Sequence, residues 1–458
     1  MHIPSQDEQC LYLNIYKPDL STNHSSLPVF VYIHGGAHNH GCSSIGVPYL
    51  YNGTNIITHS PPDQPVIVIT INYRLGVLAD MFLEELIEED PQWPTAGNYM
   101  YLDMLSALRW IQKNIGDYGG DSGNVTIFGQ SAGGLSVVDL GAVRDSSGLY
   151  RSAIVESGVG APGTSSSYYN INNALSFSKT IVQNLNCSNE DKEKVLVCIR
   201  NASIAQLFHV YADRYTRPII DQYFFPLYPP SSIHNGSYNN ISLIMGHNDF
   251  EQPICNQHPD MNLTEAIRTV TENIGTKWAP FVIDYYQLNK CSSDRNANTS
   301  RCCNIVRLVL VDKLFECDIR RIFDAFYLKY GSELETNKLF SYHLNCYPQC
   351  PIAEYKGICG HSEEVPYVFG LGMNVNILSN ENCTWDNQSR IFSNEIIGHW
   401  ISTAVTGRPQ SQWPSYNPSE PKYFHITPDQ GFISEIWKRN CSFFDEIEAE
   451  SVKETFRI

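Results

Sequence analysis

The stretch Val125-Thr-Ile-Phe-Gly129-Gln130-Ser131-Ala132-Gly133-Gly134 determines how the rest of the chain is interpreted. β-Branched and aromatic residues lead up to Gly129, and small residues follow where the chain must bend sharply. This is the pattern G-x-S-x-G, in which a strained turn between a strand and a helix lifts a serine hydroxyl above the edge of a sheet. Three fixed positions also occur by chance, so the alternative is a serine in an ordinary glycine-rich turn. The segments elsewhere in the chain distinguish the two.

The composition is that of a large globular protein. Its 458 residues are 42% hydrophobic, which is enough for an extensive core. A total of 48 acidic side chains against 31 basic ones gives a formal net charge of −17, which argues against nucleic acid and anionic membranes as partners. No apolar run reaches the roughly 18 residues that a membrane-spanning helix needs.

Cysteines and glycosylation sequons indicate a secreted protein. The 14 cysteines are more easily explained by disulfides than by reactive or metal-binding thiols. Twelve Asn-x-Ser/Thr sequons occur, at Asn23, Asn52, Asn124, Asn186, Asn201, Asn235, Asn240, Asn262, Asn298, Asn382, Asn387 and Asn440. The first four residues lack the basic and apolar regions of a signal peptide, so we expect a secreted glycoprotein whose targeting segment is not in this sequence.

Several apolar runs predict strands that are buried on both faces of a sheet. They cover residues 29–33, 66–71, 125–128, 153–155 and 242–245, and the alternating segment 8–16 predicts a half-buried strand. Apolar residues at helical spacing predict a helix between residues 97 and 115. Strands that alternate with helices indicate an α/β fold, with a mostly parallel central sheet and helices on both faces. Without a repeat or a linker, we expect one domain over residues 1–458.

Two downstream segments supply candidate partners for Ser131. A serine hydroxyl becomes a good nucleophile only when a base takes its proton, and an acid orients that base. In the chain order serine, acid, histidine, Asp249 and Glu251 follow the strand predicted at 242–245, and His361 precedes an apolar segment. Side chains two residues apart in a strand point the same way, so spacing alone leaves Asp249 and Glu251 both open.

Motifs that extend over almost the whole chain follow in one order. They are Glu8 to Asn14, His34 to Ala37, Asn72 to Gly76, Gly97-Asn98, Asp103, Ala107 to Trp110, Gly119 to Asp121, Gly129 to Gly134, Glu156 to Gly158 and His361 to Gly370. On these segments the chain resembles the type-B carboxylesterases, the family that contains the cholinesterases and the non-catalytic neuroligins. The resemblance implies an α/β-hydrolase fold and a serine hydrolase that cleaves carboxylic esters through an acyl-enzyme.

The same resemblance implies roles for individual residues. Ser131 is expected as the nucleophile and His361 as the base, and the family's acid, five residues after a strand-end glycine, matches Glu251. The oxyanion hole would consist of the backbone N–H groups of Gly36, Ala37 and Ala132. The resemblance also implies the disulfides Cys187–Cys198 and Cys317–Cys441.

The family pattern begins before this sequence does. The partner of Cys10 and the aromatic choline-site tryptophan of the family would precede Met1, so we expect the chain to lack about the first fifth of the family domain. No cofactor or metal is expected, a small ester is the expected substrate, and the oligomeric state is left open.

The chain departs from the family pattern at several positions. Family members usually have a third glycine where Ala37 stands, an aromatic or small residue at His38, an acid at Gln130 and a glycine at Gln252. Ala37 is tolerable if its φ is negative and strained if it is positive. Two alternatives therefore remain beside the esterase: a catalytically weak adhesion or binding protein on the same scaffold, and a cholinesterase.

Three other patterns resemble ligand-binding motifs but are not interpreted as binding sites. Gly158 to Gly163 matches G-x-G-x-x-G, but a proline stands where a helix should start, which argues against a dinucleotide site. The histidines at 34, 38 and 40 lack acidic partners and are expected to be bystanders rather than metal ligands. Cysteines 346, 350 and 359, with His343 and His361, fit no common zinc spacing, so further disulfides are the preferred interpretation.

Overall fold

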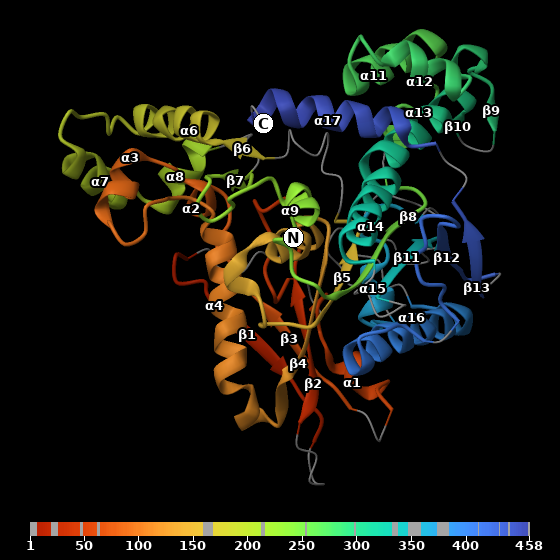
Figure 1. The fold of residues 1–458 in the computed structure, drawn as a ribbon, viewed down its shortest axis with the longest axis horizontal. Coiled ribbons are helices and arrows are strands. Elements are labelled where there is room, and N and C mark those ends of the chain that lie inside the picture. Colours follow the sequence, from red (N-terminus) through yellow and green to blue (C-terminus); the bar gives the residue numbers. More distant parts are fainter. Residues whose placement is uncertain are drawn as a thin grey trace.

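The computed structural model describes residues 7–19, 26–45, 49–61, 65–158, 168–211, 216–251, 254–296, 299–331, 338–346, 359–372, 384–410, 412–429, 431–437 and 440–456. A nine-stranded sheet lies at its centre, with helices on both faces (Figure 1). The predicted α/β architecture is therefore confirmed.

The large sheet has the strand order β1-β3-β2-β4-β5-β8-β11-β12-β13. Its strands are β1 Leu13–Tyr16, β2 Leu27–Ile33, β3 Ile67–Ile71, β4 Gly120–Gln130, β5 Ser152–Glu156, β8 Ser242–Asn248, β11 Leu339–Leu344, β12 Lys422–Thr427 and β13 Gly431–Ile436. The strands from β3 to β12 are parallel, while β1 and β13 pair antiparallel at the two edges. Two small ribbons pair β6 Tyr169–Asn170 with β7 Ile219–Ile220, and β9 Arg295–Asn296 with β10 Thr299–Ser300.

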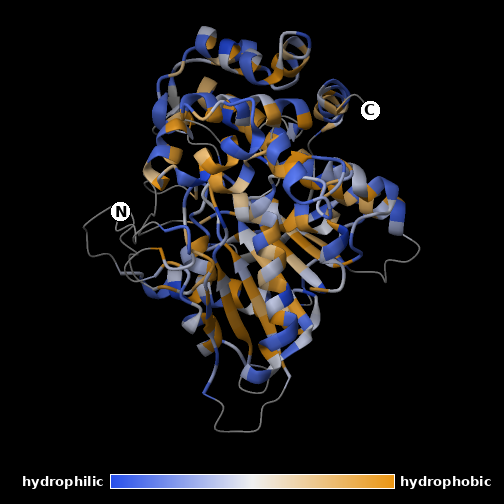
Figure 2. Ribbon diagram, turned by 90° about the vertical axis from the view of Figure 1, so that its left-hand side faces the viewer, coloured by the Kyte–Doolittle hydropathy of each residue, from blue (hydrophilic) through white to orange (hydrophobic). Residues whose placement is uncertain are grey.

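The central strands are apolar on both sides because each face of the sheet has its own core. In β2, Val29, Val31 and Ile33 belong to one core, and Phe30 and Tyr32 belong to the other. Alternate residues of a strand point to opposite faces, so a strand covered on both faces must be apolar throughout. Figure 2 shows this band of apolar strands inside a shell of more hydrophilic helices.

The helices form two layers on the sheet and two outlying groups. They are α1 Thr54–Thr58, α2 Val77–Asp80, α3 Glu84–Glu89, α4 Tyr99–Asn114, α5 Ala132–Ala142, α6 Ile171–Asn184, α7 Lys192–Asn201, α8 Ile204–Tyr211, α9 Pro229–Asn235, α10 Ile254–Gln257, α11 Leu263–Ile274, α12 Ala279–Tyr285, α13 Arg301–Val311, α14 Cys317–Tyr330, α15 Val365–Val368, α16 Asn387–Thr406 and α17 Ser442–Phe456. Short 3₁₀ turns are η1 Ile115–Tyr118, η2 Arg144–Ser146 and η4 Leu288–Lys290, and η5 Asp312–Glu316 is a π-helical turn. Helices α4, α5, α9 and α14 pack on one face of the sheet, and α15 and α16 pack on the other.

Disulfides tie the outlying helices together. Cys187–Cys198 lies in the group formed by α2, α3, α6, α7 and α8 (Figure 1). Cys255–Cys303, Cys291–Cys302 and Cys317–Cys441 lie in the group of α10 to α13 and α17. The structure thus contains both pairs that the family resemblance implied. Among the helices of the described ranges, none is long and apolar enough to cross a lipid bilayer.

Candidate active site

Ser131 stands between β4 and α5, at the end of the strand that the motif predicted. Its φ of 57° and ψ of −125° are those of a strained residue, and its N–H donates to the carbonyl of Glu156 at 2.9 Å. The flanking glycines leave room for this turn. A Cβ on Gly133 would lie 2.0 Å from the carbonyl oxygen of Ile33, and one on Gly129 would lie 2.6 Å from the backbone of Gly133. Only glycine fits at these two positions.

Three side chains from distant segments form one line of hydrogen bonds. His361 Nε2 lies 2.7 Å from Ser131 Oγ, and His361 Nδ1 lies 2.5 Å from Glu251 Oε2. Serine, histidine and carboxylate in this order have the geometry of a nucleophile, its base and the acid that orients the base. Asp249 is directed elsewhere, because its Oδ2 lies 3.2 Å from His425 Nε2. The structure therefore separates the two acids that spacing alone left open.

The carboxylate of Glu251 is fully buried but well supplied with donors. Its Oε1 accepts hydrogen bonds from the N–H of Asn248 at 2.6 Å and from Ser157 Oγ at 2.5 Å. Burial lowers the pKa of His361, but the charge of Glu251 and its hydrogen bond outweigh burial and raise this pKa above its usual value.

A second buried acid, Glu364, supports the same loop and was missed by the sequence interpretation. Its Oε2 accepts a hydrogen bond from Asn248 Nδ2 at 2.5 Å, and Asn248 Nδ2 also donates to the carbonyl of Gly360 at 2.7 Å. Burial and the neighbouring charge of Glu251 raise the pKa of Glu364 to about 7. The only sequence signal for this residue was its position three residues after His361, which no local rule distinguishes from a surface acid.

The glycine-rich loop after β2 packs against the serine turn. A Cβ on Gly35 would lie 3.0 Å from the Cβ of Ser131, so the loop approaches Ser131 as closely as its backbone allows. Gly36, Ala37 and His38 have positive φ values of 107°, 54° and 56°. Successive residues of this kind can direct backbone N–H groups to one point, as an oxyanion hole requires. Ala37 is thus in the conformation that strains an alanine.

The histidines of this loop contact the backbone. His38 Nε2 lies 2.9 Å from the carbonyl of Ala132 and 2.8 Å from Ser136 Oγ, which ties the loop to α5. His34 Nδ1 lies 2.8 Å from the carbonyl of Gly35. Burial lowers the pKa of each of the two to about 4, so both are neutral. His38 was expected to be a bystander, and its two contacts give it a structural part in the loop.

Gln130 and a disulfide complete the surroundings of the imidazole. The amide Nε2 of Gln130 lies 3.5 Å from His361 Nε2, so an uncharged group stands where the family usually has an acid. Cys346–Cys359 fixes the chain two residues before His361. The thiols of this pair are therefore not free to bind zinc. Cysteine 350, the third cysteine of that segment, lies outside the described residues.

Known proteins are similar to this chain over most of its length. The profile of the carboxylesterase family matches residues 1–444. Carboxylesterase 5A of Canis lupus familiaris is 29% identical over 439 residues, which cover 92% of this chain and 71% of that protein. Para-nitrobenzyl esterase of Bacillus subtilis (strain 168) is 28% identical over 436 residues, with 91% of this chain and 78% of that protein covered.

Solved structures show the same fold. A structure of PNB esterase superposes with a TM-score of 0.73 at 24% identity, covering 98% of this chain and 86% of the other. The Geobacillus stearothermophilus carboxylesterase EST55 gives a TM-score of 0.74 at 23% identity, covering 96% and 85%. The fold is that of the α/β-hydrolases, and the predicted serine hydrolase of carboxylic esters is confirmed. The chain belongs to the carboxylesterase family.

Proposed function

We propose that Ser131, His361 and Glu251 form the catalytic triad of this esterase. His361 removes the proton of Ser131 Oγ as that oxygen attacks the ester carbonyl, and it then donates the proton to the departing alkoxide. The acyl group stays on the serine until a water, deprotonated by the same imidazole, releases the acid and restores the serine. The observation that carries the proposal is the pair of short contacts that the imidazole makes, one on each nitrogen.

The negative charge on the carbonyl oxygen needs donors that are already in position. We assign this role to the backbone N–H groups of Gly36, Ala37 and Ala132. Ala132 is the first residue of α5, whose terminal N–H groups have no partner within the helix. An oxyanion-hole donor of this kind is typically worth about 10²–10³ in turnover.

The proposed substrate is a small uncharged ester. Gln130 puts an amide 3.5 Å from the catalytic imidazole, where an acid would attract a cationic alcohol group such as choline. We favour the esterase over both alternatives. A catalytically weak adhesion or binding protein has no use for three side chains in the geometry of a triad, and the relatives named above are a carboxylesterase and a para-nitrobenzyl esterase, not cholinesterases.

The decisive experiment is an aryl-ester assay on wild type and Ser131→Ala, combined with labelling by a serine-directed organophosphate. We expect the variant to fold, to lose turnover and to escape labelling, while wild type is inhibited at one site. The removal of a single hydroxyl at a turn costs little stability. A folded Ser131→Ala that hydrolyses aryl esters at the wild-type rate would refute the proposal.

The proposed location is outside the cell, with the whole chain folded as one domain. Five disulfides among the described cysteines favour an oxidising compartment. The sequons favour N-glycosylation. The test is the mass of the protein from its native source before and after treatment with an N-glycosidase and a reductant. An unglycosylated protein with reduced cysteines would contradict the proposed location.

A further inference from the structure

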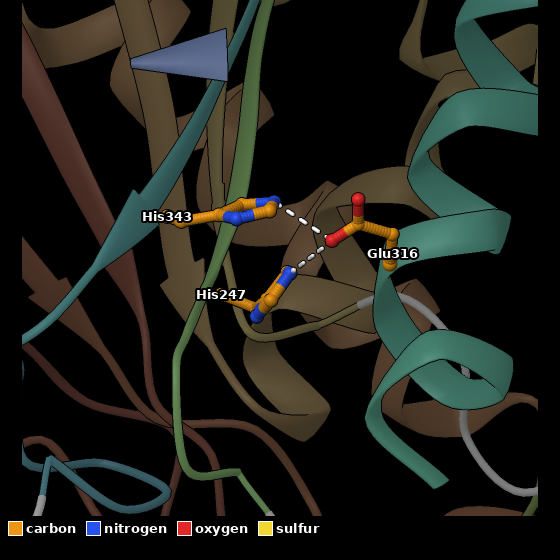
Figure 3. A group of neighbouring side chains, drawn as sticks. All are labelled: His247, Glu316 and His343. Carbon is orange, nitrogen blue, oxygen red and sulfur yellow. Dashed lines mark hydrogen bonds and ion pairs between the residues drawn. The ribbon is translucent and has the colours of Figure 1, made fainter. Parts of the chain in front are cut away.

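Three buried side chains meet close to the proposed triad without belonging to it. His247 on β8 lies beside His343 on the neighbouring parallel strand β11, and the two rings have centroids 4.3 Å apart. Glu316, from the π-helical turn η5, points between them (Figure 3). Its Oε2 lies 3.4 Å from His247 Nε2 and 3.0 Å from His343 Nε2. One atom from each residue thus converges on a common point.

The hydrogen bonds around the cluster indicate which atoms carry electron pairs. His247 Nδ1 lies 2.9 Å from the carbonyl of Asn248 and donates its N–H there, so Nε2 is the ring nitrogen that faces Glu316. Trp437 Nε1 donates to His343 Nε2 at 3.3 Å, so an ion bound at this nitrogen would take the lone pair that now accepts the indole N–H. The ionised Glu316 contributes further lone pairs. The three atoms that face one another are two imidazole nitrogens and one carboxylate oxygen, which a cation, either a proton or a metal, can hold together.

The donor set selects one class of metal. Two imidazole nitrogens and one carboxylate oxygen suit zinc and its transition-metal neighbours, whereas calcium and magnesium prefer oxygen ligands alone. Glu316 Oε2 lies 3.4 and 3.0 Å from the two Nε2 atoms, close to the roughly 3.3 Å that separates the ligands of a tetrahedral zinc ion, and all three donor atoms lie within 4.8 Å of one another. The hydrogen bond from His247 Nδ1 to a backbone carbonyl is the support that metal-bound histidines usually have.

We propose that His247, Glu316 and His343 bind one divalent transition-metal ion of the zinc class. No local sequence motif could indicate this site, because 69 residues separate His247 from Glu316. The sequence interpretation considered His343 only with nearby cysteines and expected no metal. The cluster arises from the pairing of β8 with β11 and from the turn before α14.

The site is linked to the catalytic loop but separate from the triad. Asn248, next to His247, donates its N–H to Glu251 at 2.6 Å. The ring of Phe315 contacts both histidines, with its centroid 5.9 Å from that of His247 and 6.3 Å from that of His361. The ion joins two strands and a helical turn behind the loop that carries the acid, so its role is to stiffen that region. It takes no part in ester cleavage.

The test measures metal binding directly on the intact protein. Wild type treated with a chelator is titrated with Zn²⁺ by calorimetry and with Co²⁺ by visible absorption, beside Glu316→Gln and His343→Phe. The control is His258→Gln, since His258 Nδ1 lies 2.9 Å from Glu265 but on the surface and without a second histidine. We expect one ion per chain with the spectrum of four-coordinate Co²⁺ in wild type and control, and at least a tenfold weaker affinity in the two variants.

Two results would overturn the proposal. One is wild type that binds no stoichiometric Zn²⁺ or Co²⁺, which would leave a proton as the cation in the cluster. The other is unchanged affinity in both Glu316→Gln and His343→Phe. If a variant fails to fold, X-ray absorption spectroscopy on zinc-loaded wild type identifies the zinc ligands directly. Two imidazoles in the zinc shell support the site, and a shell without imidazole refutes it.

Discussion

The exchange of Glu251 for glutamine should abolish most ester turnover, whereas Asp249→Asn should cost little. Both substitutions replace a carboxylate with an amide of the same shape, and the two positions are two residues apart in one loop. They therefore form a matched pair. Of the two acids, only Glu251 contacts the imidazole of His361, with Oε2 at 2.5 Å from Nδ1. Asp249 contacts His425 instead, at 3.2 Å.

The size of the effect follows from the partners of the carboxylate. Oε1 accepts from Asn248 and Ser157, so a glutamine must place its carbonyl oxygen there and turn its NH₂ group toward His361. The imidazole must then accept on Nδ1 and keep its proton on Nε2, the nitrogen that faces Ser131. It can no longer remove the serine proton. The same tautomer error in serine proteases costs about 10⁴ in turnover, equivalent to about 5.5 kcal/mol.

The dependence of kcat/KM on pH gives a second, independent test of the role of Glu251. The base is the neutral imidazole, so kcat/KM is lost as the pH falls through the pKa of His361. Glu251 raises this pKa, and its charge is absent in Glu251→Gln, so the residual activity of that variant should persist to lower pH. The profile of Asp249→Asn should match wild type.

The assay is kcat/KM for a short-chain aryl ester across the pH range, with near-ultraviolet circular dichroism to establish that each variant is folded. A larger loss in Asp249→Asn than in Glu251→Gln would show that the acid is misassigned. A shift of the acidic limb of Glu251→Gln to higher pH would refute the electrostatic argument.

Four further variants, one of them a control remote from His361, test the surroundings of the site. His38→Phe removes both hydrogen bonds that hold the oxyanion loop, so kcat for aryl esters should fall about 10- to 100-fold while KM changes little; an unchanged kcat would contradict the positioning role. Ala37→Gly removes the strain of an alanine in the left-handed conformation, so the free energy of unfolding measured in urea should rise by about 1 kcal/mol. A fall in this free energy would show that Ala37 is not strained. Two double variants each remove one disulfide: Cys346→Ser/Cys359→Ser opens a loop of 13 residues, and Cys187→Ser/Cys198→Ser opens one of 11 residues. The greater chain entropy of the unfolded state should lower the free energy of unfolding by about 3 kcal/mol in each variant. Only the first pair lies beside His361, so only its loss should reduce turnover of the folded protein, and equal turnover in the two double variants would contradict this.

Much of the fold was predictable because its strands are buried on both faces. The runs at 29–33 and 66–71 became the strands Leu27–Ile33 and Ile67–Ile71, since continuous apolar residues favour a strand that is buried on both faces. The helix expected at 97–115 begins only at Tyr99. Asn98 adopts a left-handed conformation, and its side chain makes two 2.9 Å hydrogen bonds with the backbone of Ile219, which lies far along the chain.

The buried polar contacts of the site could not be predicted from the sequence, because they join residues that lie far apart along the chain. Asn248, Ser157 and Glu364 meet only because β5, β8 and the segment after His361 come together in the folded chain. No periodicity marks a buried acid among exposed ones. The resemblance to a family could indicate the triad, because it carries residues over by position. It could not indicate the donors around the triad.

Backbone strain explains why local rules fail in this region. The described residues include ten non-glycine residues with positive φ, and five of them are Ala37, His38, Ser131, Ser157 and Ser362, all beside the triad or the oxyanion loop. Each costs about 1–2 kcal/mol, so together they approach the whole stability of a typical domain. Contacts made elsewhere must hold them. The N–H groups of Ser131 and Ser157 donate to carbonyls of β5 and β8 at 2.9 and 2.8 Å. The parallel sheet therefore imposes the conformations that local sequence disfavours, and the strain is concentrated where the proposed chemistry needs fixed N–H groups and a raised serine hydroxyl.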